Sequence, residues 1–268
     1  MSTERVTIDL ADNGVAQVRL NRPDKMNALD PAQFEAIINV GEQLRSMEGL
    51  RAVVLAGEGR AFCAGLDVSS FTAAADADRK PLAERTHGNA NAFQEVAMTW
   101  RKCPVPVVAA VHGVCFGGGL QIASGADIRV VHPASRMAIM ELKWGLVPDM
   151  GGYHLWRGLV RDDILRELVY TNREFSGTEA HSYGLATHVS EDPLGKATDI
   201  ANDIANRNPD AIRGAKRLSE AMLENSGDEI LLAESLEQAA VMRTPNQIEA
   251  VMAGMQKRPA KYTDTPTR

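Results

Sequence analysis

Cysteine is scarce in this 268-residue chain, and long apolar segments are absent from it. The three cysteines, Cys63, Cys103 and Cys115, are odd in number and widely spaced, which is typical of reduced, buried thiols rather than of a disulfide framework or a metal site. No stretch reaches the roughly 18 consecutive apolar residues of a membrane-spanning helix. The first ten residues also lack the apolar core and the cleavage site of a signal peptide, so we expect a cytoplasmic location.

Clustered positive charge and clustered histidine are missing as well. Lysine and arginine number 29 against 35 aspartates and glutamates, and the net charge of −6 leaves no basic surface for nucleic acid or an anionic membrane. The six histidines are scattered, which disfavours a metal centre, and we expect no metal and no separate cofactor. What the chain does have is 44% hydrophobic residues, enough for the core of one large domain or of a domain with an appendage.

The first half of the chain alternates predicted strands and helices. Residues 5–10 and 15–20 alternate in polarity around an Asn-Gly pair and predict a β-hairpin, because this pair tolerates the positive φ of a tight turn. Asp30 followed by Pro31 predicts the capped start of a helix. Further strands are predicted at 51–56, 107–111, 127–132 and 136–140, and a further helix at about 93–100.

The second half is predicted to be helical. Residues 69–91 have weak periodicity and predict an irregular segment beside a site, or a lid. From residue 151 onward the pattern is almost wholly helical, and Ser176 with Glu179 forms a predicted capping box. The last helices are predicted near 194–206, 210–223, 229–242 and 246–257. The whole pattern predicts an α/β (α+β) fold that ends in a helical layer.

Three consecutive glycines, Gly117, Gly118 and Gly119, stand between the strand at 107–111 and a predicted helix at 120–126. Such a turn allows a ligand to approach the backbone closely, because no side chain is in the way. The first N–H groups of a helix lack intrahelical partners and carry partial positive charge, so the Gly118 N–H is a candidate donor to an anion. Glycine turns also serve merely to pack a helix on a sheet, and by itself this motif is compatible with both roles.

Two common catalytic motifs are absent. The segment from Gly113 to Gly119 does not present the G-x-G-x-x-G pattern after the first strand of the chain, which disfavours a nicotinamide enzyme. The G-x-S-x-G pattern of many serine hydrolases is also missing. The glycine turn therefore needs a different explanation.

Five segments together resemble the crotonase (enoyl-CoA hydratase/isomerase) family. They are LNRPDKMNAL at 20–29, AFCAGLD at 61–67, the glycines at 117–119, ELKWGLVPDMGG at 141–152 and KRP at 257–259. The resemblance covers nearly the whole chain and implies a crotonase-like spiral of ββα units with a C-terminal helical trimerisation region, as a homotrimer or a dimer of trimers. We therefore expect a spiral core with the acyl-CoA site in residues 1–195 and a helical oligomerisation region in residues 196–268.

The resemblance also implies a substrate and the residues that bind it. The substrate would be an acyl-CoA thioester, and the N–H groups of Leu66 and Gly118 would form an oxyanion hole, in which losing one donor typically costs roughly 3 kcal/mol. The residues implied to line the coenzyme A and thioester path are Ala64, Leu66, Asp67, Val68, Ser69 and Gly118. Arg22 and Lys25 lie where members of the family contact the nucleotide end of coenzyme A. The alternative interpretation is that both are solvated surface charges.

The sequence departs from the family's hydratases at one position. Those enzymes use two glutamates, and Glu141 matches the second, but the first is replaced by Gln121, whose amide orients water without transferring a proton. A single carboxylate at Glu141 is enough to shift a double bond. Asp149, eight residues later, matches a second acid of dienoyl-CoA isomerases, and its alternative role is to cap the helix that starts at Gly151.

Two classes of function follow from this pattern. The first is an enoyl-CoA hydratase/isomerase-type enzyme with Glu141 as the main acid/base, acting by double-bond isomerisation or by hydration with Gln121 orienting the water. The second is a catalytically weak acyl-CoA-binding protein that kept the fold. The missing glutamate favours isomerisation over hydration.

Overall fold

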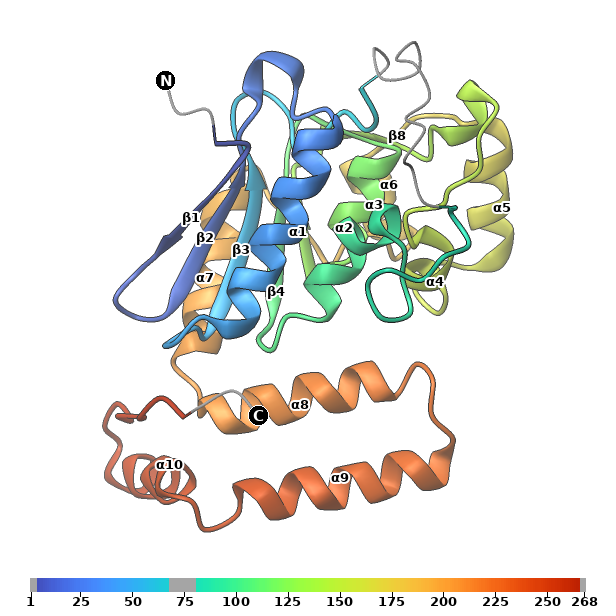
Figure 1. The fold of residues 1–268 in the computed structure, drawn as a ribbon. Helices are drawn as coiled ribbons and strands as arrows, with labels where there is room; N and C mark the ends of the chain where they lie inside the picture. The colour runs from blue at the N-terminus through green and yellow to red at the C-terminus, as the bar shows by residue number, and fades with distance from the viewer. Residues whose placement is uncertain (1–3, 68–80, 266–268) are drawn as a thin grey trace.

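The largest sheet of the described residues has six strands, and its four N-terminal strands stand on the left of Figure 1. The computed structural model describes residues 4–67 and 81–265. In order across the sheet, the strands are β1 (Val6–Leu10), β2 (Val15–Leu20), β3 (Ala52–Gly57), β4 (Val107–Val111), β6 (Ile128–Val131) and β9 (His188–Val189). Strands β1 and β2 are antiparallel and form the predicted hairpin, whereas the other neighbours are parallel.

A second, three-stranded sheet joins β5 (Val114–Phe116), β7 (Arg136–Ala138) and β8 (Phe175–Ser176). The expectation of an almost wholly helical chain after residue 151 is wrong at β8 and β9. Each of these strands has two residues, which is too short to show the alternation that reveals a strand in a sequence. These two strands are recognised only by their hydrogen-bonded pairing with β7 and β6, respectively.

Helices cover both faces of the large sheet. Helix α1 (Pro31–Ser46) lies on one face and α7 (Pro193–Ala205) on the other (Figure 1). The helices between them are α2 (Ala92–Arg101), α3 (Gly118–Ser124), α4 (Gly152–Trp156), α5 (Asp162–Thr171) and α6 (Gly177–Ser182). Both predicted helix starts are confirmed, since Asp30 accepts a hydrogen bond from the Gln33 N–H and Ser176 forms a capping box with Glu179.

Alternation along the strands buries both faces of the sheet. On β3, Val53 and Leu55 belong to the larger core cluster, whereas Val54 packs in a second cluster with Ala197 and Ala201 of α7. Burial on both faces is typical of a parallel sheet covered by helices. The predicted division at residue 195 falls inside α7, which packs on the sheet rather than with the helices that follow it.

Three further helices form a layer below the sheet in Figure 1: α8 (Pro209–Ala221), α9 (Gly227–Val241) and α10 (Pro245–Gln256). Lys216 attaches α8 to the core. Its buried ammonium donates to the carbonyls of Trp100 and Val105 and, over 2.9 Å, to the carboxylate of Asp127. In the part of the chain that the structure describes, no helix has the length and apolar character needed to cross a membrane.

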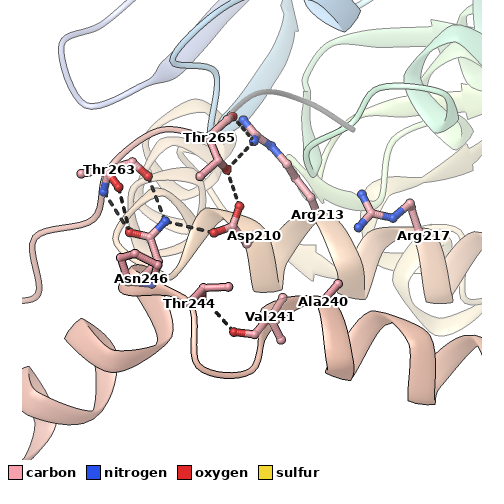
Figure 2. A pocket seen from close by; sticks show the side chains of 10 residues that line it. Asp210, Arg213, Arg217, Ala240, Val241, Thr244, Asn246, Thr263 and Thr265 are labelled. Carbon is pink, nitrogen blue, oxygen red and sulfur yellow. Dashed lines mark hydrogen bonds between the residues drawn. The ribbon is translucent and has the colours of Figure 1, made fainter.

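A cavity of about 410 Å³ lies inside the C-terminal layer, between α8, the turn from α9 to α10 and residues 263–265 (Figure 2). Its walls are tied together by hydrogen bonds. Asn246 donates to Asp210 and to the carbonyl of Thr263, and Arg213 donates to the carbonyl of Thr265. The C-terminal segment thus forms one wall of this cavity, and none of the residues predicted for the site lines it.

Candidate active site

The two glycine-containing turns predicted to form the site lie side by side. Cys63 and Cys115 pair in a parallel β-bridge, in which the Cys63 N–H donates to Val114 and the Phe116 N–H donates to Cys63. These two bonds, of 3.1 and 3.0 Å, hold the turn after Cys63 against the start of α3.

Glycine is required where the turns touch. Gly65 has a φ of +84°, and a Cβ atom on it would lie 2.6 Å from the carbonyl oxygen of Phe116 and 3.6 Å from the nitrogen of Gly118. A Cβ atom on Gly119 would lie 2.4 Å from the carbonyl oxygen of Cys63. The absence of side chains therefore lets one backbone approach the other.

Two backbone donors at this contact have no acceptor among the residues that the structure describes. Leu66 pairs with Leu29, but the bonds of that bridge run from Leu29 N–H to Gly65 and from Asp67 N–H to Leu29, which leaves the Leu66 N–H on the other side of the chain. Gly118 is the first residue of α3, where no intrahelical acceptor exists. Within residues 4–67 and 81–265, neither N–H has a hydrogen-bond partner.

The carboxylate of Glu141 lies next to these donors. It is at the start of a 3₁₀ turn, η3 (Glu141–Trp144), and its Oε1 would be 3.4 Å from a Cβ atom placed on Gly117. Its other oxygen, Oε2, is buried and has no hydrogen-bond partner in the described part of the chain. Burial raises the pKa of the Glu141 carboxyl above its ordinary value. The nearby backbone N–H groups of Glu141 and Met140 and the amide of Gln121 oppose this rise, and the negative charge of Asp149 adds to it.

Gln121 contacts Glu141 directly. Its fully buried amide donates from Nε2 to Glu141 Oε1 over 2.5 Å. Its carbonyl oxygen accepts from the backbone N–H groups of Met150, at 3.0 Å, and Gly152, at 2.9 Å. An amide oxygen has two lone pairs, so both acceptor positions of this side chain are filled.

Asp149 is exposed and lies near enough to Glu141 for its charge to affect that carboxyl. The alternative role considered for it, capping the next helix, does not occur. Helix α4 begins after Gly151, a residue with a left-handed φ of 90°, and has no side-chain cap.

Comparison with known proteins places the chain in a family. The sequence profile of the enoyl-CoA hydratase/isomerase family matches residues 11–265. The chain belongs to this family. Among solved structures, a putative enoyl-CoA hydratase from Streptomyces coelicolor A3(2) is similar with a TM-score of 0.87 and 30% identity, covering 98% of this chain and 95% of that one. The predicted crotonase-like fold and the prediction of an enzyme of this family are both confirmed.

The family relatives include both isomerases and hydratases. A mitochondrial Delta(3,5)-Delta(2,4)-dienoyl-CoA isomerase of Mus musculus is 30% identical, over 96% of this chain and 81% of the relative. A peroxisomal protein of the same name from Arabidopsis thaliana is 29% identical, over 94% and 93%. A mitochondrial methylglutaconyl-CoA hydratase of Mus musculus is 27% identical, over 94% and 80%.

Arg22 and Lys25, the two basic residues predicted to contact the nucleotide end of coenzyme A, differ from each other in their surroundings. The side chain of Arg22 is 13% exposed, and its guanidinium pairs with Asp67 at 2.7 Å and with Asp30 at 3.4 Å. It is therefore not a solvated charge, because it joins the start of α1 to the turn that carries Leu66. Lys25 is exposed in the short turn η1 (Pro23–Lys25).

The remaining predicted binding residues are Ala64, Val68 and Ser69. Ala64 is partly exposed, and its N–H donates to the carbonyl of Met26. Val68 and Ser69 lie outside the described residues.

Asn27, a buried residue for which the sequence predicted no role, holds the segment before Ala64 and Gly65 in place. Asn27 is fully buried with a φ of 55°, and its Nδ2 donates to the carbonyls of Ala61 and Phe62, while its Oδ1 accepts from the Arg22 N–H. Asparagine tolerates left-handed backbone better than most residues, which was the signal available in the sequence. Asn27 therefore fixes the segment that leads into Ala64 and Gly65.

The cysteines beside the site have no catalytic character. Cys63, Cys103 and Cys115 are free and buried, as predicted. Burial raises the pKa of Cys63 to about 12 and that of Cys115 well above its ordinary value, so both stay protonated thiols at neutral pH. No cluster suited to a metal ion occurs among the residues that the structure describes.

Proposed function

We propose that this protein is an acyl-CoA isomerase that shifts a double bond in an unsaturated acyl-CoA thioester. The observation that carries the proposal is the presence, at one place, of a buried carboxylate oxygen, Glu141 Oε2, and two backbone donors, Leu66 N–H and Gly118 N–H, none of which has a hydrogen-bond partner among the described residues. The names of the dienoyl-CoA isomerase relatives support it. Coenzyme A is part of the substrate, and the reaction needs no separate cofactor.

The proposed reaction is a proton transfer from one carbon of the acyl chain to another. Ionised Glu141 removes a proton from carbon, and the electron pair moves through the conjugated chain to the thioester oxygen. The two N–H groups stabilise the negative charge on that oxygen. Glu141, which now carries the proton, returns it to a different carbon, directly or by way of the ionised Asp149, while the carbon–oxygen double bond re-forms.

Hydration is the competing reaction, and a methylglutaconyl-CoA hydratase is among the relatives. A hydratase must take a proton from water and give one to carbon. The only acceptor atom of Gln121 already receives two backbone N–H bonds, so it has no lone pair left for a water proton. This favours isomerisation over hydration with a water oriented by Gln121.

The decisive experiment measures turnover of 2-enoyl, 3-enoyl and 3,5-dienoyl thioesters by the ultraviolet absorbance of the conjugated product. We expect absorbance to rise with the 3-enoyl or the 3,5-dienoyl substrate, because isomerisation creates conjugation with the thioester. Loss of absorbance from the 2-enoyl substrate alone would instead identify a hydratase. Binding of all three without turnover would identify an acyl-CoA-binding protein.

For substrate binding, we propose that the turn carrying Ala64, Leu66, Asp67, Val68 and Ser69 lines the coenzyme A path. Lys25 is exposed near this turn and is available to the nucleotide phosphates. Arg22 contributes through Asp67, whose carboxylate it holds at 2.7 Å.

We further propose that the protein is a homotrimer or a dimer of trimers. Helix α9 has no buried residue, and its Leu231, Leu232 and Leu236 are each more than 60% exposed. Soluble monomers seldom expose a large apolar patch. We expect light scattering to give three or six times the chain mass of 29.0 kDa.

The substitution Leu232→Glu should lower the measured mass, because it places a charge on the apolar face of α9. Gln43→Glu, which adds the same charge at an exposed position of α1, should leave the mass unchanged. A wild-type protein of 29.0 kDa in solution would contradict the proposal.

A further inference from the structure

The buried amide of Gln121 connects three parts of the active site. It stands on α3, it receives two N–H groups from the chain entering α4, and it donates to the carboxylate of Glu141. None of its surface is exposed. Each polar atom of this side chain therefore has a defined protein partner.

The orientation of the amide is fixed by its surroundings. With the carbonyl toward Met150 and Gly152, both backbone donors are satisfied, and the NH₂ group faces Glu141. The reverse orientation would place an NH₂ group against two N–H donors and a carbonyl oxygen against a carboxylate oxygen. All three hydrogen bonds would be lost in a buried site.

This fixed donor makes the two oxygens of Glu141 unequal. Oε1 is held by Gln121, whereas Oε2 is buried and unpartnered in the described part of the chain. The terminal torsion of a glutamate is otherwise broad. The hydrogen bond therefore limits the rotation of the carboxylate and presents Oε2 in one direction.

We propose that Gln121 is a positioning residue that selects Oε2 of Glu141 as the oxygen that transfers the proton, and that it keeps the enzyme an isomerase by offering no acceptor to water. This inference rests on the proposed isomerase function and adds a determinant of which reaction occurs. It changes the role expected for Gln121 from binding water to orienting the neighbouring carboxylate.

The test compares the wild-type enzyme with Gln121→Met and Gln121→Glu, using the pH dependence of kcat/KM as the readout. Methionine has a similar volume but no hydrogen bond to Glu141. We expect kcat to fall by roughly 10–100-fold with little change in KM, because the base loses its alignment. The rise of kcat/KM with pH should move to higher pH, since the ionised form of Glu141 loses a hydrogen bond.

Gln121→Glu keeps an acceptor for the N–H groups of Met150 and Gly152, so it guards against a failure of the methionine variant to fold. Two carboxyl groups within hydrogen-bond distance cannot both ionise easily. We therefore expect the increase of kcat/KM with pH to occur at higher pH than in the wild type. Hydration of a 2-enoyl thioester should also exceed that of the wild type, because a second proton-transferring group is now present.

Ser124→Ala is the matched control. Ser124 is buried on the same helix, and its hydroxyl accepts from Trp156 Nε1 of α4 without touching Glu141. This variant should lose thermal stability and keep the wild-type pH dependence.

The outcomes separate the two proposals. If wild-type protein does not convert 3-enoyl or 3,5-dienoyl thioesters, the isomerase function fails. If wild type is active and every folded Gln121 variant keeps its pH dependence, only the positioning role is overturned.

Discussion

Replacing Glu141 by glutamine is expected to lower kcat by about 10²–10⁴-fold, the usual contribution of a general acid–base group. The amide cannot accept the proton that the proposed reaction removes from carbon. The fold should be unaffected, because Oε2 makes no hydrogen bond within the described residues. Steady-state turnover of a 3-enoyl or 3,5-dienoyl thioester measures the effect.

Glu220→Gln is the control for this loss. Glu220 is another carboxyl whose pKa is raised by burial, but it lies on α8 beside Arg101, away from the two turns. Its variant should keep wild-type turnover. Full activity of the Glu141→Gln protein would show that another group moves the proton.

The pH dependence of the same reaction has a defined sign. In the proposed mechanism Glu141 is a base in its ionised form. Because its pKa is raised, activity should increase with pH through a value above that of an ordinary glutamate. The negative charge of Asp149 contributes to the raised pKa of Glu141. Asp149→Asn should therefore move the increase to lower pH.

Gly65→Ala is expected to reduce kcat by roughly 10²–10³-fold, comparable to the loss of one oxyanion donor. The added Cβ atom would lie 2.6 Å from the carbonyl oxygen of Phe116 and must push the two turns apart. The N–H groups of Leu66 and Gly118, which are proposed to bind one thioester oxygen together, would then move apart. Turnover and the binding of a substrate analogue should both be measured, because the transition state is affected more than the ground state.

Gly158→Ala separates this clash from backbone strain. Gly158 has a φ of +81°, close to the +84° of Gly65, but apart from its own chain neighbours no described residue has an atom within 4 Å of the position of its Cβ. Both variants should lose about 1–2 kcal/mol of stability from the left-handed conformation. Only Gly65→Ala should lose activity. An equal loss of activity in both variants would mean that backbone strain, and not the separation of the two turns, causes it.

The structure and the sequence agree most closely where the signal is local. The hairpin, the capped start of α1, the strand β4 and the last four helices were all predicted within a few residues. Such elements can be predicted because alternation, helical spacing and capping residues are visible over a short stretch of sequence. The two-residue strands β8 and β9 gave no such signal.

The sequence by itself determined the family, the order of those strands and helices that carry a local signal, and the two turns that need glycine, because each depends on residue types and spacing along the chain. Only the tertiary structure decided what the polar side chains do. Arg22 meets Asp67, and Gln121 meets both Glu141 and the backbone before α4, across 20 or more residues. The direction of a buried amide is set by the donors around it, and those donors are assembled only when the chain folds.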